Sequence, residues 1–427
     1  MNLLPIVIFG ILVLALLETP VFTIIAALSL ACLFFVDHDL LAFQMILIEM
    51  NRLGSMPVLV ALPLFTFVGC LLTETQAPRR IMNFIEALLG WLPGGLAMAA
   101  LCSCAFFTAL TGASGVTIVA LGSILYPVMR SKGYDETFTL GLLTTSGSLG
   151  LLFPPSLPVI LYGVIAQVDI ARIFTAALFP GLLLVAVLCL YAFFKQAGEQ
   201  SKAPSNGISL RRIRKTFVEG IWDWPVIGLI LVGVYGGFVT IAEVSAVVLV
   251  YVVAVECFVL KEVSFLRGLP SIMVESAVLS GAIIVILGFA LGFTGFLVDE
   301  QIPNRILVFL TTFCKSKMMF LAGLNLFLLA VGCIMDIFSA IVIVVPIIIP
   351  IAVSYGVDPI HLCVIFLVNL EIGYSTPPVG INLFISSLKF EKPITLLYRA
   401  SVPYLILLLL VLVLITYVPW LSLLFVS

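Results

Sequence analysis

The feature that most constrains this chain is a pair of helix-breaking segments that occurs twice in the sequence. Adding 223 to a residue number carries Gly150 onto Gly373 and Pro154-Pro155 onto Pro377-Pro378. The same offset makes these further pairs: Pro127 with Pro350, Gly133 with Gly356, Asp135 with Asp358 and Pro180 with Pro403. Glycine frees the backbone dihedral angles and proline restricts them, so both residues interrupt helices. Their shared spacing therefore predicts two structural repeats, each with its own breaks.

The amino-acid composition indicates whether these repeats lie in water or in a membrane. Hydrophobic residues make up 63% of the 427-residue chain and charged residues only 10%, whereas a soluble domain has roughly one half and one quarter. Apolar runs of about 18 or more residues recur along the sequence, and each can cross a bilayer as a helix. Since backbone groups must pair internally in hydrocarbon, the predicted fold is an all-α polytopic membrane protein. The run Leu3–Leu17 has no basic lead-in or cleavage site, which predicts a retained first helix.

In each repeat we predict a re-entrant helical hairpin followed by a broken helix. Consecutive prolines remove two amide donors, so each break is intrinsic to the sequence. Non-helical backbone at membrane depth is tolerated where it lines a cavity. The expected ranges are 93–129 for the first hairpin with its tip at Gly112–Gly115, 135–168 for the first broken helix, 318–355 for the second hairpin with its tip near Gly332–Ser339, and 359–388 for the second broken helix.

Basic residues predict the orientation in the membrane. The most polar stretch, 196–221, carries four cations within Arg211–Lys215 and is assigned to the cytoplasm. Five predicted crossings separate the two hairpins, and an odd number inverts the second repeat relative to the first. The first hairpin is then expected to enter from the cytoplasm and the second from outside, with both chain termini periplasmic.

Paired breaks near the membrane midplane are typical of secondary transporters, where half-helix N-termini attract an anion and unwound carbonyls can coordinate Na⁺. An ionisable residue at that depth is costly and is a functional candidate. Two interpretations of Asp336 stay open, as an ion ligand or as a cap for the second helix of its hairpin. Glu371 is either a coupling residue or a structural hydrogen-bond partner. Glu243, Glu256 and Glu275 are expected near helix ends, facing the interface.

Other function classes have little support in the sequence. There is no nucleotide-binding loop, so the chain is not expected to hydrolyse ATP. An intramembrane enzyme is a remote alternative, because neither a His-Glu-x-x-His motif nor an acidic pair in a Gly-x-Gly-Asp context is present. The nine cysteines lack metal-ligand spacing and are interpreted as reduced packing residues. No organic cofactor and no nucleic-acid partner are predicted.

Five motifs together resemble the large membrane subunit of tripartite ATP-independent periplasmic (TRAP) transporters. They are Gly112-Ala113-Ser114-Gly115, Phe153-Pro154-Pro155-Ser156-x-Pro158, Met335-Asp336, Asn369-Leu370-Glu371-Ile372-Gly373 and Thr376-Pro377-Pro378-Val379-Gly380. The resemblance covers essentially the whole chain and is nearest to the sialic-acid members. It implies Na⁺-coupled import of an organic acid, either a sialic acid or a C4-dicarboxylate, by an elevator mechanism in the bacterial inner membrane. It also implies two partners, a small four-helix membrane subunit on another polypeptide and a periplasmic substrate-binding protein.

An elevator needs a mobile and a fixed domain, which are expected at these ranges: scaffold 1–75 and 222–297, arm helices 76–92 and 298–317, transport domain 93–195 and 318–427, and cytoplasmic basic loop 196–221. Arg79/Arg80 and Arg305 open the two arms, which are amphipathic and should lie along opposite membrane surfaces. The runner-up function is a stand-alone Na⁺/dicarboxylate symporter of related fold that needs no binding protein.

The breaks and tips supply the predicted ligands. The first Na⁺ site is expected at Gly112, Ala113, Ser114, Gly115, Gly150 and Pro154, held mainly by backbone carbonyls. The second is expected at Gly332, Met335, Asp336, Gly373, Thr376 and Gly380, with Asp336 supplying a charge that its counterpart Ala113 lacks. The solute is expected at Ser114, Pro155, Ser156, Thr376, Pro378 and Asn382.

Overall fold

A computed structural model of the chain describes residues 43–198, 209–236 and 239–426, together with Thr23, Ala26, Ala27, Leu30 and Ala31. The helix predicted over 3–17 lies outside the described residues, and so does most of the one predicted over 20–36. All the regular elements of the described part are helical. Seven of these helices are long and apolar enough to cross a membrane, or up to ten if each sharply bent helix pair counts as one span.

The elements follow the predicted order of spans, hairpins and breaks. The first half of the chain contains α3 (Phe43–Gly54), η2 (Pro57–Val60), α4 (Ala61–Thr73), α5 (Ala77–Leu89), α6 (Gly95–Thr111), α7 (Ser114–Ser131), α8 (Glu136–Ser146), α9 (Leu157–Ala166), α10 (Ile170–Gly198) and α11 (Leu210–Glu219). The second half contains α12 (Trp224–Gly236), α13 (Ile241–Ala254), η3 (Val255–Val259), α14 (Gly268–Asp299), α15 (Ile302–Phe313), α16 (Lys317–Ile334), α17 (Ile337–Ser354), α18 (Pro359–Gly373), α19 (Ile381–Phe390), α20 (Ile394–Tyr417) and α21 (Trp420–Leu423).

The helix bounds repeat with the spacing found in the sequence. Helices α7 and α17 begin and end 223 residues apart, and so do the ends of α6 and α16 and the starts of α8 and α18. Beyond the breaks the offset grows by one residue, because α9 ends at Ala166 and α19 at Phe390. The hairpin tips and breaks lie where the sequence predicted them.

The turn before each broken helix shows why the repeat is encoded locally. Gly133 and Gly356 have φ angles of +83° and +72°, which are left-handed values that favour glycine. Two residues later an aspartate caps the next helix. Asp135 accepts a hydrogen bond from the Phe138 amide at 2.9 Å, and Asp358 accepts one from the Ile360 amide at 2.7 Å.

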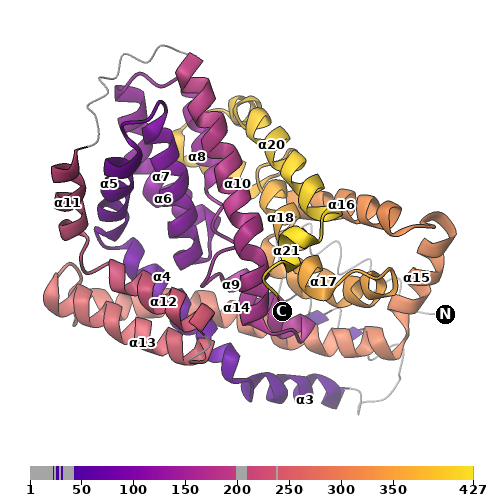
Figure 1. The fold of residues 1–427 in the computed structure, drawn as a ribbon. Coiled ribbons are helices and arrows are strands. Elements are labelled where there is room, and N and C mark those ends of the chain that lie inside the picture. Colours follow the sequence, from indigo (N-terminus) through magenta and orange to yellow (C-terminus); the bar gives the residue numbers. More distant parts are fainter. Residues whose placement is uncertain are drawn as a thin grey trace.

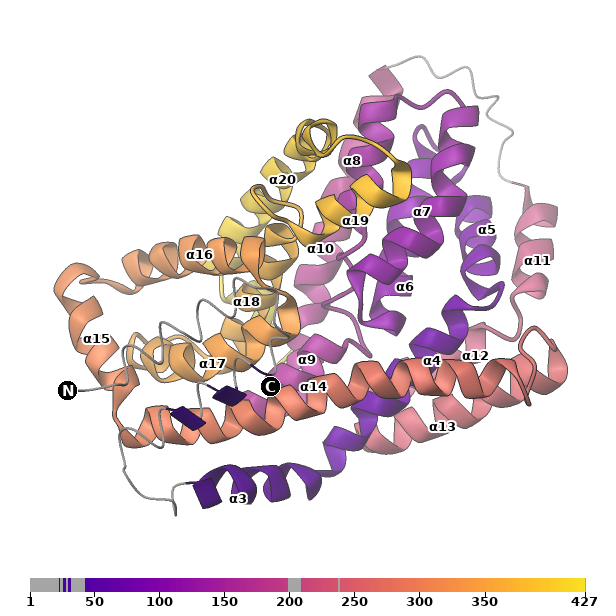
Figure 2. The ribbon, with the colours of Figure 1, turned by 180° about the vertical axis from the view of Figure 1, so that it is seen from behind.

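The helices form two groups (Figures 1 and 2). Helices α4, α13 and α14 pack together with α3 along one side of the molecule, and α12 packs against α13. The two arm helices, α5 and α15, lie at opposite ends of the long helix α14 (Figures 1 and 2). Helix α5 is bent by 74° from the helix that precedes it, so it crosses the end of this group instead of extending it.

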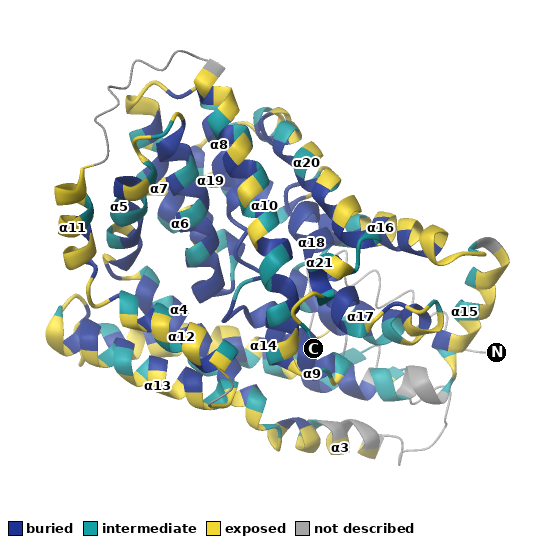
Figure 3. Cartoon of the chain, viewed as in Figure 1, coloured by how far each residue is buried: buried dark blue, intermediate teal, exposed yellow. Residues whose placement is uncertain are grey.

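The other group encloses the first halves of the broken helices. The described residues 138–152 are all buried, and α18 is buried from Ile360 to Gly373 (Figure 3). The repeats exchange partners around this centre: α8 packs against α20 and α18 against α10, while α7 packs against α19 and α17 against α9. Each repeat therefore completes the packing of the other.

Candidate ion and solute site

The first hairpin tip is a sharp reversal between α6 and α7. Gly112 ends α6 with a φ of +66°, and Ala113 is extended before Ser114 begins α7. A Cβ at Gly112 would lie 2.7 Å from Leu157 Cγ, so the tip packs directly on the start of α9. At Gly115 a Cβ would lie 2.6 Å from Ile385 Cδ1, which places α19 of the other repeat against the same tip. Only a residue without a side chain fits so closely.

The first break, residues 147–156, is fixed to this hairpin through its backbone. The Thr108 hydroxyl lies 2.8 Å from both the Gly147 carbonyl oxygen and the Thr117 hydroxyl. A Cβ at Gly150 would lie 2.1 Å from the Ala105 carbonyl oxygen. Inside the break the Pro154-Pro155 bond is cis, and the buried Ser156 hydroxyl donates to the Leu151 carbonyl. Tip and break thus form one packed unit.

The second tip has the same shape with different chemistry. Met335 is extended and Asp336 caps α17, accepting from both the amide (3.0 Å) and the hydroxyl of Ser339. The Ile337 amide donates to the Tyr374 hydroxyl, which comes from the second break. The capping interpretation of Asp336 is therefore confirmed as a structural role, and its role as an ion ligand stays a prediction.

The second break, Gly373–Gly380, closes on the second hairpin backbone to backbone. A Cβ at Gly373 would lie 2.6 Å from Gly332 Cα, and the Gly380 amide donates to the Cys333 carbonyl at 3.0 Å. The Thr376 hydroxyl donates to the Ile372 carbonyl at 2.7 Å, and the Pro377-Pro378 bond is cis. The residues predicted for the second Na⁺ site thus come from two segments that are in contact.

The two breaks meet each other at equivalent positions. Ser148 and Glu371 differ by 223 in number, and the Ser148 hydroxyl lies 3.4 Å from the Glu371 carbonyl oxygen. Beside them the Thr144 hydroxyl donates to the Ser386 hydroxyl at 2.9 Å. The start of the first break and the last turn of α18 are therefore in direct contact.

Several buried polar groups around the second break have no hydrogen-bond partner among the described residues. They are both carboxylate oxygens of Glu371, the Ser375 hydroxyl and both amide atoms of Asn382. A buried polar group without a partner costs free energy, and native proteins keep such groups at functional sites or bind water or ions there. Asn382, predicted as a solute contact, is fully buried at the start of α19.

The two breaks differ in exposure. Pro154, Pro155 and Ser156 are buried, whereas Pro377 and Pro378 are exposed. Of the predicted solute contacts, Ser114, Ser156 and Asn382 are buried, and Thr376 is half-buried. In this conformation the second break is thus more accessible than the first.

The family model described as the DctM component of tripartite ATP-independent periplasmic transporters matches residues 8–421. The chain belongs to the DctM family. The resemblance to the large TRAP membrane subunit is thereby confirmed. The family is one of transporter permeases, so the chain is not an enzyme, and with its apolar helices it is a multi-pass inner-membrane protein.

Similar proteins support this assignment to the DctM family, and a solved structure shares the fold. The C4-dicarboxylate TRAP transporter large permease protein DctM of Pseudomonas aeruginosa is 36% identical over 86% of this chain and 85% of its own length. The isethionate TRAP transporter permease protein DctMQ of Oleidesulfovibrio alaskensis is 34% identical over 87% of this chain and 58% of its own length. The Alcanivorax borkumensis YdaH transporter shares the fold, with a TM-score of 0.66 at 14% identity over 88% of this chain and 87% of its own.

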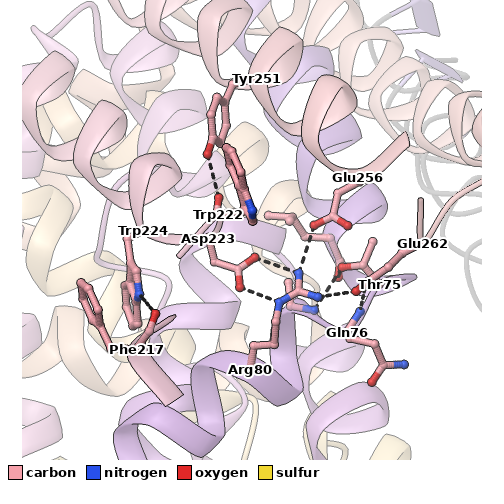
Figure 4. Close-up of polar contacts among 12 residues, drawn as sticks. Thr75, Gln76, Arg80, Phe217, Trp222, Asp223, Trp224, Tyr251, Glu256 and Glu262 are labelled. Carbon is pink, nitrogen blue, oxygen red and sulfur yellow. Dashed lines mark hydrogen bonds and ion pairs between the residues drawn. The ribbon is translucent and has the colours of Figure 1, made fainter. Parts of the chain in front are cut away.

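A second polar cluster in this DctM-family chain was not predicted from the sequence. Arg80, on the arm helix α5, contacts three acidic residues from the stretch between the two repeats: Asp223, Glu256 and Glu262 (Figure 4). Its guanidinium binds Asp223 in bidentate fashion, with Nε to Oδ2 at 2.7 Å and Nη2 to Oδ1 at 3.0 Å. Glu256 Oε1 is 3.3 Å from Nη2.

Glu256 lies near a helix end as predicted, but the prediction that it faces the membrane interface is wrong. Its side chain is 2% exposed, because the π-helix η3 turns it inward to Arg80. Burial raises the pKa of the Asp223 carboxyl above its ordinary value, although Arg80 lowers it. The sequence offered one signal for this cluster, the acidic residues that lie beside apolar runs. Nothing near them in the sequence indicated that their partner would be Arg80.

Replacing Arg80 by glutamine should destabilise the protein strongly. The Arg80→Gln change would leave the buried carboxylates of Asp223 and Glu256 without a cation, and breaking a buried ion pair typically costs about 3–5 kcal/mol. Thermal unfolding in nanodiscs measures the loss, and hydrogen exchange should rise across α5. The matched control is Arg79→Gln, an exposed neighbour on the same helix. Equal unfolding temperatures for the two variants would show that the cluster does not hold α5.

Proposed function

We propose that this chain carries out Na⁺-driven import of a carboxylated organic solute by an elevator mechanism, together with a small membrane subunit and a periplasmic binding protein. The observation that carries the proposal is the repeated contact between a hairpin tip and a helix break. Each such contact brings unwound carbonyls and helix N-termini to the same buried place. Carbonyl oxygens suit a small hard cation, and helix N-termini suit an anion.

The exchange of helices between the repeats supports an inverted arrangement. Two segments that pack on each other reciprocally, with equivalent residues touching at Ser148 and Glu371, would be related by an approximate twofold axis. If that axis lies in the membrane plane, the two hairpins enter from opposite faces. The arm helices α5 and α15 at opposite ends of α14 (Figure 2) agree with that orientation.

The two ion sites would be unequal. In the first, the tip from Gly112 to Gly115 and the break near Gly150 would offer only backbone oxygens and hydroxyls. In the second, Asp336 would add a negative charge next to the Gly332–Gly373 contact. A capping carboxylate can also bind a cation, because an ionised carboxyl group has about four lone-pair sites and Ser339 uses two.

The solute would lie between the two tips, near the N-termini of α7, α9 and α19. Ser114, Ser156, Thr376 and Asn382 supply polar atoms there, and the unpartnered amide of Asn382 supports a ligand at this place. Bound Na⁺ and the helix N-termini would offset the anionic charge. The carboxylated solute class agrees with the C4-dicarboxylate relatives, and sialic acid stays a prediction from the motif resemblance.

Uptake by proteoliposomes tests the function as a whole. The chain reconstituted with its small subunit should accumulate a radiolabelled C4-dicarboxylate or sialic acid only with an inward Na⁺ gradient and the binding protein. Omitting each component in turn gives the controls. Full-rate uptake by the chain alone would instead favour the stand-alone Na⁺/dicarboxylate symporter.

Removing the charge of Asp336 tests the second ion site. Asn is as good a helix cap as Asp, so Asp336→Asn should keep α17 intact while raising the Na⁺ concentration for half-maximal uptake roughly tenfold or more, about 1.4 kcal/mol. Asp358→Asn is the matched control, because Asp358 caps α18 in the same repeat at a distance from the tip. Unchanged Na⁺ activation in Asp336→Asn would limit Asp336 to capping.

An elevator also predicts that joining the two helix groups stops transport. Leu182 on α10 and Leu231 on α12 line one apolar cavity of about 270 Å³, so a cysteine pair there can be bridged by a bifunctional thiol reagent. In a background without native cysteines, the bridge should abolish uptake. The control is a cysteine pair at Phe106 on α6 and Leu178 on α10, which line the same cavity. Both helices belong to the proposed transport domain, so bridging this pair should leave uptake unchanged. Loss of uptake in both pairs, or in neither, would contradict the elevator.

A further inference from the structure

Helix α11 lies at one edge of the molecule, just before α12 in the chain (Figure 1). It is bent by 78° from α12, and it packs beside the arm helix α5 (Figures 1 and 2). The range 196–221 was predicted as a basic loop, but its residues Leu210–Glu219 form a helix, and residues 199–208 lie outside the described part of the chain. Ser209 caps this helix by accepting from the Arg212 amide, which begins a regular turn within a stretch of cations.

One side of α11 is fixed to the rest of the protein. Arg212 Nη2 is 3.2 Å from Glu86 Oε1 on α5, and Lys132 at the end of the first hairpin binds the same oxygen at 2.8 Å. Phe217 stacks on Trp224 with ring centroids 5.5 Å apart, and the Trp224 indole donates to the Phe217 carbonyl (Figure 4). Because these contacts hold one side of α11 against the protein, the opposite side of the helix faces outward.

The outward side carries a basic stripe of Arg211, Arg214 and Lys215. The spacing of i, i+3 and i+4 places the three residues on one helix face, and all three are exposed. Within the described ranges no carboxylate lies within ion-pair distance of Arg211 or Arg214, while Lys215 is 3.8 Å from Glu219. The charge of the stripe is therefore largely uncompensated.

Exposed apolar side chains accompany the stripe. Leu210 is 79% exposed, Val218 54% and Ile221 48%, and Trp222 follows at 43%. A helix set at a steep angle to the apolar helix that follows it, with cations and large apolar groups both exposed, has the composition of a membrane-interface helix. Tryptophan is also enriched at that depth.

We propose that the basic stripe of α11 binds the phosphate groups of anionic phospholipids at this membrane face. Guanidinium groups match phosphate oxygens in bidentate fashion, and the two arginines stand one helix turn apart. Bound lipid would hold α11, and through Arg212 and Glu86 it would also hold the arm helix α5. The proposal rests on the membrane placement of the chain and is independent of Na⁺ coupling, so its test does not involve transport.

Lipid titration of the full-length protein tests the site. Phosphatidylglycerol or phosphatidylcholine is added to the detergent-purified chain, and bound lipid is counted by native mass spectrometry. The triple variant R211Q/R214Q/K215Q should bind phosphatidylglycerol about ten- to a hundredfold more weakly at low ionic strength, with phosphatidylcholine unchanged. The matched control R172Q/R305Q/K315Q removes the same charges from exposed positions on other elements and should bind like wild type. R211K/R214K keeps the charge but loses the bidentate guanidinium geometry, so it should bind phosphatidylglycerol more weakly than wild type and more tightly than the triple variant.

A second measurement needs no variant of the stripe. Trp222 adjoins α11, and its share of the fluorescence is the difference between wild type and Trp222→Phe. Brominated phosphatidylglycerol should quench that share more than brominated phosphatidylcholine, and added salt should remove the preference. Equal quenching, or unchanged lipid affinity in the triple variant, would overturn the proposal. Loss of small-subunit binding with lipid binding intact would identify the stripe as a protein-docking surface instead.

Discussion

The structure depends on how two interrupted helices satisfy their backbone groups away from water. A double proline removes amide donors and leaves carbonyls unpaired, which is costly inside a membrane unless protein surrounds the break. Here the hairpins provide that surrounding. The Cys333 carbonyl accepts from the Gly380 amide, and the Thr108 hydroxyl lies next to the Gly147 carbonyl. A break and a hairpin tip are therefore needed together.

Glycine contacts make this pairing close and rigid. Gly332 and Gly373 meet backbone to backbone, and Gly150 packs on the carbonyl of Ala105. Such contacts leave no room for a side chain, so neither element can shift without the other. The same closeness gathers carbonyl oxygens and helix N-termini at each tip, where the proposed ions and solute would bind. The glycines that the packing requires are thus also among the residues proposed for the ion sites.

Charged contacts hold the periphery, where packing is looser. Arg80 binds α5 to the bend before α12 and to η3, while Glu86 on the same helix joins Lys132 of the first hairpin to Arg212 of α11. The arm helix is therefore attached through its first turns to the α12–α14 group and through its last turns to the hairpin. Glu86 is more exposed than Asp223 and Glu256, and exposed ion pairs are weaker than buried ones when a partner is removed. Of the two attachments, the one to the hairpin is the easier to break.

The sequence by itself determined the breaks, the hairpin tips, the repeat and the family, because glycine and proline act on the backbone within a few residues of their own position. For that reason it correctly placed the turn between α6 and α7 and the turn between α16 and α17. It did not decide whether Asp336 is a helix cap or an ion ligand, since both roles need the same residue at the same place.

Tertiary structure decided the rest. Arg80 meets acidic residues 143 to 182 positions away, and Glu256 turns inward only because a π-helix rotates it. Basic residues in 196–221 predicted a side of the membrane but not a helix, because α11 is stabilised by its contacts with α5 and Trp224. Neighbouring residues determine the local backbone conformation, whereas charges that are distant in the sequence pair only once the chain has folded.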